Sequence, residues 1–265
     1  MAIDSHQPAA LHLALQVERL YAALIQSAAA NSNSEPSLGG KLLCAGELGT
    51  EGRALIVASN IAGAASLSAT DVQAAQKQAI KDGVIDFLVT SLDEALRILK
   101  NEIRKCEAVA VCVAGAPEAI EREMLERGVL PDLLPPGSDS APQYATFLIQ
   151  GARQIRLSNL DENQTLLAWS ATAAPVKWLP KLDAVALDCL HPEETAARRW
   201  LRLAPRYLGR QAQGQRLLRC TNETAQKFLT QLRNQVEQGE IKVPVNINLT
   251  TPAQTIQHQF SPPTR

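Results

Sequence analysis

Short apolar runs alternate with helix-compatible stretches through residues 41–134. The runs at 41–46, 64–69, 84–90, 108–114 and 129–134 are apolar along most of their length, which is typical of strands buried on both faces. The stretches between them, at 54–65, 71–81, 92–105 and 117–127, have the composition or the end signals of helices. This alternation predicts the α/β class: a doubly wound, mostly parallel sheet with helices on both faces.

The first strand and helix are joined by a turn that contains Gly46, Gly49 and Gly52. In such a unit, glycines let a phosphate group approach the free N–H groups at the start of the helix. The spacing is not the usual G-x-G-x-x-G, and Glu47 and Glu51 place negative charge where a phosphate would lie. The turn is therefore either a tight connection that binds nothing or the site of a nucleotide or another small ligand, with Arg53 as the anion contact.

Outside this region the pattern is less regular. Helical spacing of apolar residues predicts a helix over 11–27, followed by a polar loop over 28–40. In the second half we expect short strands or strand-helix pieces at 144–149, 154–158 and 165–170, and a further apolar run at 182–190. We also expect strands at 216–220 and 241–249, and helices at 192–210 and 222–238. Pro244 predicts that the last strand is an edge strand or irregular, and 251–265 is expected to be a poorly ordered tail.

The predicted organisation has four parts. They are an N-terminal helix and loop (1–40), a first domain (41–137), a C-terminal α/β half (138–250) and the tail (251–265). The pattern leaves open whether the strands of the C-terminal half continue the first sheet.

Composition excludes several classes of function. The chain has 265 residues, 26 basic and 27 acidic, and a net charge of -1, so it has no overall attraction to nucleic acid or to an anionic membrane. No apolar stretch reaches the length of a membrane span, and the N-terminus lacks a basic signal region. The five cysteines form no CxxC motif, which favours reduced thiols. We therefore expect a cytoplasmic protein.

One cluster in the second half has the residue types of a nucleophilic site. Asp188, Cys189 and His191 lie close together, with Asp183 nearby, where a strand is expected to meet a helix. A Cys and His pair can act as nucleophile and base. The alternative is a buried cysteine beside a helix-capping turn, and a metal site is not expected because no second histidine is in reach.

A run without acidic residues carries seven arginines. Four of them recur every four residues and would line one face of a helix. They are Arg198, Arg202, Arg206 and Arg210, and the run continues with Arg199, Arg216 and Arg219. This face is either solvated and ion-paired within the fold, or a site for an anionic ligand or an acidic partner; RNA binding is the weakest alternative because aromatic residues are few.

Residues 17–134 resemble the NAD-binding, Rossmann-like insert domain of urocanase (urocanate hydratase). The family pattern G-G-L-G-G-M-G-G-A-Q is similar to GELGTEGRAL at 46–55, and the later family motifs D-E-A-L and R-G-V-x-P-D-L are similar to 93–96 and 127–133. The resemblance implies a Rossmann-like sheet and a dinucleotide site. The positions that it points to are Gly46, Gly49, Gly52, Arg53, Thr70, Asp71 and Gly115.

The departures from the family pattern are concentrated in that site. Glu47, Thr50 and Arg53 replace glycines, and Leu55 replaces the family's glutamine. Thr70 stands where an acid would bind the ribose, although the adjacent Asp71 could substitute. The family's T-D-Q-T-S-A-H-D-P segment is replaced by 135–142, and the catalytic core that surrounds the insert in urocanase is not found in this sequence.

The sequence therefore favours a protein without urocanate hydratase activity, with a ligand-sensing or assembly role. The alternatives are an enzyme that uses a nucleotide or an NAD-type cofactor, and a subunit that completes a site with a partner chain. We expect no resident cofactor, although the fold leaves NAD or another nucleotide open. We also expect a homodimer, because the helix at 11–27 has leucines on more than one side and the strand at 241–249 is expected to be an edge strand or irregular.

Overall fold

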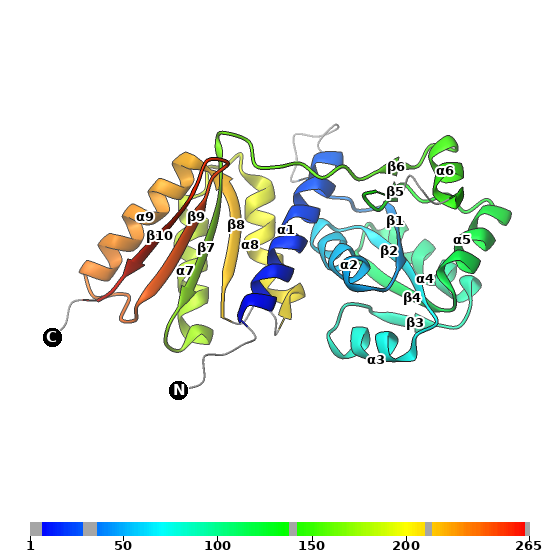
Figure 1. Ribbon diagram of the computed structural model, residues 1–265, viewed down its shortest axis with the longest axis horizontal. Coiled ribbons are helices and arrows are strands. Elements are labelled where there is room, and N and C mark those ends of the chain that lie inside the picture. Colours follow the sequence, from blue (N-terminus) through cyan, green and yellow to red (C-terminus); the bar gives the residue numbers. More distant parts are fainter. Residues whose placement is uncertain (1–6, 29–35, 138–141, 210–213, 263–265) are drawn as a thin grey trace. The chain divides into compact units, whose positions relative to one another are not determined.

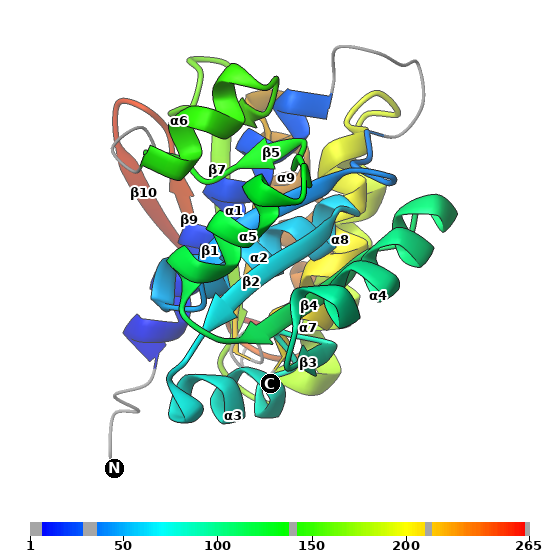
Figure 2. The same cartoon turned by 90° about the vertical axis from the view of Figure 1, so that its right-hand side faces the viewer.

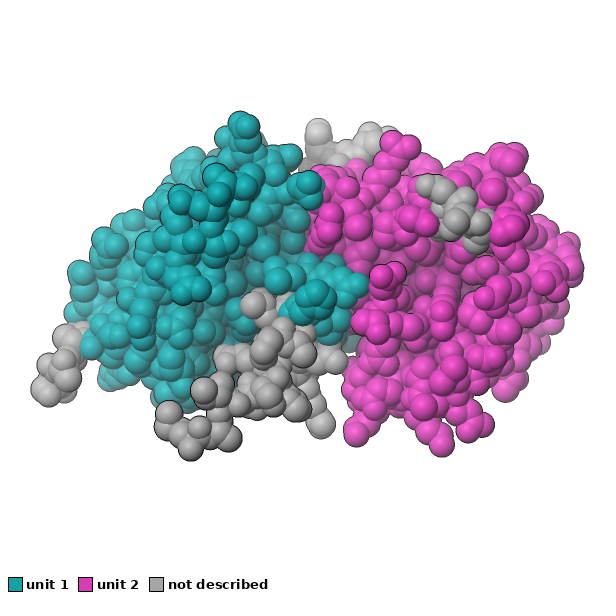
Figure 3. Space-filling model, viewed as in Figure 1, with its two compact units in different colours: residues 1–18, 159–265 teal, residues 19–158 magenta. Residues whose placement is uncertain are grey.

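The protein divides into two compact units in its computed structural model, which describes residues 7–28, 36–137, 142–209 and 214–262. One unit is formed by Arg19–Ser158, and the other by Met1–Glu18 together with Asn159–Arg265 (Figure 3). The division falls within helix α1 (Gln7–Ala28), which contributes to both. Within the described residues, no helix combines the length and the apolar character needed to span a membrane.

The unit Arg19–Ser158 contains a six-stranded sheet in the order β3-β4-β2-β1-β5-β6, and every pairing in it is parallel. Its strands are β1 (Leu42–Glu47), β2 (Ala65–Thr70), β3 (Phe87–Val89), β4 (Val109–Ala114), β5 (Leu133–Leu134) and β6 (Arg153–Gln154). Its helices are α2 (Thr50–Ala62), α3 (Gln73–Lys81), α4 (Leu92–Lys105), α5 (Pro117–Glu126) and α6 (Pro142–Ile149). The predicted α/β, Rossmann-like, doubly wound sheet is confirmed.

The sheet of this unit is covered on both faces (Figure 2). Apolar side chains of β2 and β4 pack with those of α4, α5 and α6, where Leu99, Met124 and Phe147 are almost completely buried. Helix α2 packs against β1 and β2, and ten of its residues are buried. Burial on both faces explains why β2 and β4 read as continuous apolar or small-residue runs.

Local signals set the helix boundaries in this unit. The Ser91 side chain accepts a hydrogen bond from the Glu94 N–H at 3.3 Å, which caps α4 as the sequence predicts. Pro117 is the first residue of α5. A backbone N–H at this position would have no acceptor within the helix, so proline costs no hydrogen bond there.

The second unit has a sheet of its own, with strand order β10-β9-β7-β8 and only antiparallel pairings (Figure 1). The strands are β7 (Gln164–Ala171), β8 (Arg216–Thr221), β9 (Val245–Thr250) and β10 (Thr255–Phe260). The helices are α7 (Pro175–Cys189), α8 (Thr195–Tyr207) and α9 (Asn222–Glu237). The two sheets are separate, which answers the question that the sequence pattern left open.

Buried polar pairs join the elements of this second unit. Asp183 of α7 accepts hydrogen bonds from Trp169 Nε1 at 3.2 Å and from Arg216 Nε at 2.8 Å. The carboxylate of Glu18 in α1 accepts hydrogen bonds from Nε and Nη2 of Arg219, at 2.7 and 3.0 Å. The Glu18 side chain is only 3% exposed.

Two apolar segments of the second half are helices. The apolar run at 182–190 belongs to α7, which begins at Pro175. Its buried residues follow helical spacing, but the first two of them lie before residue 182, so the apolar run alone does not show the pattern. They are Trp178, Leu179, Leu182, Val185, Ala186 and Cys189. Residues 144–149 belong to α6, which buries Tyr144 and Phe147 three positions apart.

The C-terminal predictions also need correction. Strand β9 begins after Pro244 and lies between β10 and β7, so it is not an edge strand, and Pro244 removes no donor from its ladder. The expected tail contains strand β10, which pairs with β9 from Thr255 to Phe260. Helix α8 is shorter than expected, and Pro205 lies in its last turn.

Candidate ligand site at the end of the first strand

The carboxyl end of β1 is the switch point of the parallel sheet. Strand β1 pairs with β2 on one side and with β5 on the other, and the chain crosses from β4 to β5 past it. Ligands of open α/β sheets bind at such a point. The predicted glycine turn lies here, between β1 and α2.

The three glycines have different environments. Gly46 has a φ of +69°, and a Cβ placed on it would lie 2.6 Å from the Tyr144 hydroxyl. A Cβ on Gly52 would lie 2.0 Å from the Glu47 carbonyl oxygen, so Gly52 permits the close approach of α2 to β1. Gly49 precedes α2, and a Cβ placed on it would have no neighbouring atom within 4 Å. Two of the three glycines are therefore explained by contacts inside the chain.

A buried polar cluster occupies the space beside Gly46. The Tyr144 hydroxyl donates a 2.6 Å hydrogen bond to Oε1 of Glu121, and both residues are at least 90% buried. Burial raises the pKa of Glu121 above its usual value. The Cys44 thiol lies in the same cluster, and burial together with the charge of Glu121 raises its pKa to about 12. This cluster holds protons tightly and has no thiolate nucleophile at neutral pH.

The cluster leaves little free space. A cavity of about 10 Å³ adjoins it, lined by residues that include Cys44, Ser68, Pro117, Glu121 and Met124. That volume suits at most one water molecule.

The other predicted cofactor contacts are used within the unit or are exposed. Arg53 forms an ion pair with Asp82 of the turn after α3. The Thr70 hydroxyl accepts a hydrogen bond from the Val72 N–H, and its carbonyl oxygen accepts one from the Gly115 N–H at 3.2 Å. Asp71 is exposed.

Comparison with protein families supports the ancestry of this region. Residues 20–147 match the family model of the urocanase Rossmann-like domain. The resemblance inferred from the sequence is therefore confirmed for this segment. The match covers α2 to α5 and reaches Phe147 of α6, so it includes both Glu121 and Tyr144.

The residues at the switch point do not fit the dinucleotide that the urocanase-like domain implies. A pyrophosphate needs open backbone N–H groups and positive or neutral surroundings. Here the space above Gly46 is filled by Tyr144, and the acidic groups nearby are Glu47, Glu51 and Glu121. The one predicted cation, Arg53, is already paired.

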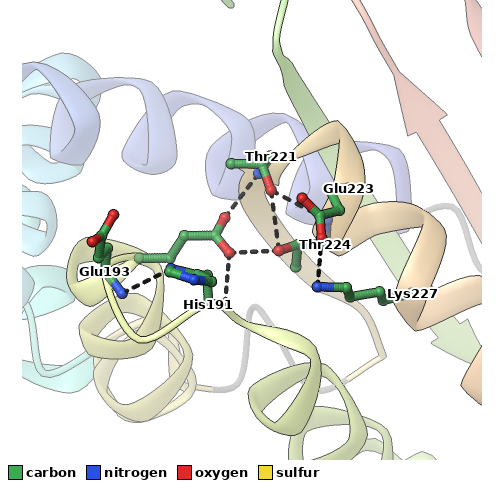
Figure 4. A network of polar contacts seen from close by, with 7 residues as sticks. His191, Glu193, Thr221, Glu223, Thr224 and Lys227 are labelled. Atoms are coloured by element: carbon green, nitrogen blue, oxygen red, sulfur yellow. Dashed lines mark hydrogen bonds and ion pairs between the residues drawn. The ribbon is translucent and has the colours of Figure 1, made fainter.

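The second candidate site, around Cys189, has a different organisation from the one expected, and Figure 4 shows the polar contacts near its neighbour His191. Cys189 lies in the last turn of α7, and its thiol donates to Oε1 of Gln231 at 3.2 Å rather than to His191. Burial raises the pKa of Cys189 to about 11, and the adjacent Asp188 adds to the shift. His191 is exposed, and its Nδ1 accepts a 3.4 Å hydrogen bond from the Glu193 N–H. The structure does not bring these residues together as a nucleophile and base.

Glu194 is the centre of this network. Its carboxylate accepts hydrogen bonds from the N–H groups of Thr221 and His191, each at 2.9 Å, and from the Thr224 hydroxyl at 2.5 Å. The carboxylate thus joins the turn between α7 and α8 to the start of α9, where the helix dipole favours negative charge. The network caps a helix.

The arginine run is distributed over several partners. Arg216 and Arg219 are on β8 and pair with Asp183 and Glu18. Arg198 donates to the Leu190 carbonyl oxygen at 2.6 Å. On α8, Arg206 lies 5.4 Å from the centre of the Tyr207 ring, Arg202 is exposed, and Arg210 lies outside the described residues. An anion site on α8 remains a prediction.

The sequence did not single out Tyr144 or Glu121. The pattern at 144–149 predicts a short strand or a strand-helix piece, and the approach of Tyr144 to Gly46 depends on the packing of α6 against α5. Glu194 stands at the start of α8, where an acidic side chain complements the helix dipole, but its contacts with Thr221 and Thr224 depend on the tertiary fold. Among the described residues, no group of three or more His, Cys, Asp or Glu side chains could hold a metal ion.

Proposed function

We propose that this protein is a divergent urocanase-like Rossmann protein that lacks urocanate hydratase activity and serves a ligand-sensing or assembly role. The main support is the position of Tyr144, whose hydroxyl fills the space above Gly46 and bonds to buried Glu121. A dinucleotide could reach the switch point only if this pair moved apart. Its phosphates would then face the carboxylates that surround the turn.

The two alternatives make different predictions. An enzyme that uses an NAD-type cofactor must bind that cofactor at the turn. A subunit that completes a site with a partner chain would bind a nucleotide only in the presence of that partner. The raised pKa values of Cys44 and Cys189 argue against thiolate chemistry by either cysteine in the chain alone.

Calorimetric titration with NAD tests the proposal. We expect no binding at micromolar concentrations and no loss of urocanate absorbance when protein, NAD and urocanate are incubated together. Binding of NAD at micromolar affinity or tighter would overturn the proposal and favour the enzyme.

The ligand-sensing part needs a broader search. A thermal-shift screen of nucleotides and imidazole-containing metabolites, combined with mass spectrometry of copurifying molecules, should find a compound that raises the melting temperature. A compound that stabilises the protein and is also turned over would contradict a non-catalytic role.

A further inference from the structure

Strand β3 is an edge strand with an unusual composition. It ends the order of the parallel sheet, and its three residues are Phe87, Leu88 and Val89. Phe87 is 47% exposed and Leu88 is 38% exposed. The opposite edge, β6, consists of Arg153 and Gln154. Edge strands normally carry charge or are covered, because a bare apolar edge pairs with other chains.

The surface next to β3 extends the apolar region. Two adjoining depressions lie along β3 and α4, and both are lined by Arg97 and Ile98 of α4. One of them also includes Phe87 and the other includes Leu88 and Val89. The exposed apolar groups are therefore continuous across the strand and the helix.

The charges around this surface are of both signs. The Arg97 guanidinium interacts electrostatically with Asp93 and Glu94 of its own helix, and Asp86, Glu94 and Glu102 line the same depressions. A surface that carries a cation beside carboxylates can complement a copy of itself, whereas a surface of one sign would repel its copy.

We infer that β3 and α4 form the contact between two copies of this chain in a twofold-symmetric dimer. A twofold axis at a sheet edge pairs the edge strand with itself in antiparallel orientation, because both copies use the same patch. With the axis at Leu88, the central residue, Leu88 faces Leu88 of the second copy and Phe87 faces Val89. Arg97 of each copy then lies on the side of the carboxylates of the other. This inference is independent of whether the switch point binds a ligand.

The dimer is tested first by mass. Light scattering of the full chain at micromolar concentration should give twice the monomer mass of 28.6 kDa. Leu88→Lys should return the mass to that of the monomer, because a lysine at an edge strand prevents pairing and is tolerated by the fold. Ile149→Lys, at a residue of α6 that is 87% exposed, is the matched control and should stay dimeric. Circular dichroism melting checks that both variants are folded.

Cross-linking tests the register. Directly opposed residues of antiparallel strands have Cα atoms about 4.5 to 5.5 Å apart, within the range that a disulfide spans. Leu88→Cys in a Cys106→Ser background, which removes the exposed native thiol, should therefore form a covalent dimer on mild oxidation. Ile149→Cys in the same background should not.

Several outcomes would overturn the inference. A parent chain that is monomeric, a dimer that persists in Leu88→Lys, or a stable dimer in which Leu88→Cys fails to cross-link each contradicts pairing through β3.

Discussion

The Tyr144 hydroxyl donates to buried Glu121 at 2.6 Å beside Gly46, and this pair stands where a Rossmann-like sheet would receive a ligand. The pair brings together residues 23 positions apart, from α5 and α6. It determines both the stability of this end of the sheet and what can enter it.

The pH dependence of stability should report on Glu121. Its pKa in the folded protein is raised above the usual 4.5 by burial, so the folded state holds the proton more tightly than the unfolded state. The stabilisation is complete below the unfolded pKa and is lost as pH rises through the folded pKa. The side chain in Glu121→Gln cannot lose a proton. The melting temperature of this variant should therefore rise relative to that of the parent as pH increases from 4 to 8. A difference that does not change with pH would contradict this assignment.

Removing the Tyr144 hydroxyl should destabilise the protein. Tyr144→Phe leaves the Glu121 carboxyl without its hydrogen-bond donor in a buried site, and we expect a loss of about 1–3 kcal/mol in the free energy of unfolding. Urea denaturation measures it. Tyr207→Phe, at a half-buried tyrosine of α8, is the control and should cost less. Equal effects in the two variants would argue against a specific role for the Tyr144 hydroxyl.

Replacing only one partner of the Glu18 and Arg219 ion pair should lower the free energy of unfolding strongly. Arg219→Met leaves a carboxylate that is 3% exposed without a partner, so a loss of about 3–5 kcal/mol is expected. Replacing both residues, as Glu18→Leu with Arg219→Met, should recover most of that loss. If the double variant is as unstable as the single one, the pair is not the source of the effect. Lys227→Met, which removes an exposed ion pair with Glu223, should cause no measurable change.

Thiol reactivity separates a structural cysteine from a nucleophile. Cys106 is exposed, whereas Cys44, Cys112, Cys189 and Cys220 are buried. A disulfide reagent at neutral pH should therefore modify one thiol quickly and the other four only on unfolding. Cys106→Ser should remove the fast phase. A fast reaction that persists in this variant and maps to Cys189 would restore the nucleophile hypothesis.

The regular part of the fold was accessible from the sequence, because strands buried on both faces and capped helices leave local signals. Ser91 before α4 and Pro117 at the start of α5 are examples. The errors arose where a short apolar run was read without its neighbours, as in α7, or where tertiary pairing decides the outcome, as in β10. The candidate site could be located from its glycines. Its closure by Tyr144 could not be predicted, since it depends on contacts between residues distant in sequence.

The pairing of Glu18 with Arg219 also has a consequence for the order of folding. These residues are 201 positions apart, and the unit Arg19–Ser158 lies entirely between them. Its sheet is built from a continuous stretch of chain and can form as soon as that stretch has left the ribosome. The antiparallel unit must wait for Arg219, and bridging so long a loop slows its formation unless the intervening domain has already condensed and shortened the distance. Folding of the Rossmann-like unit would then bring the two segments of the antiparallel unit within reach of each other.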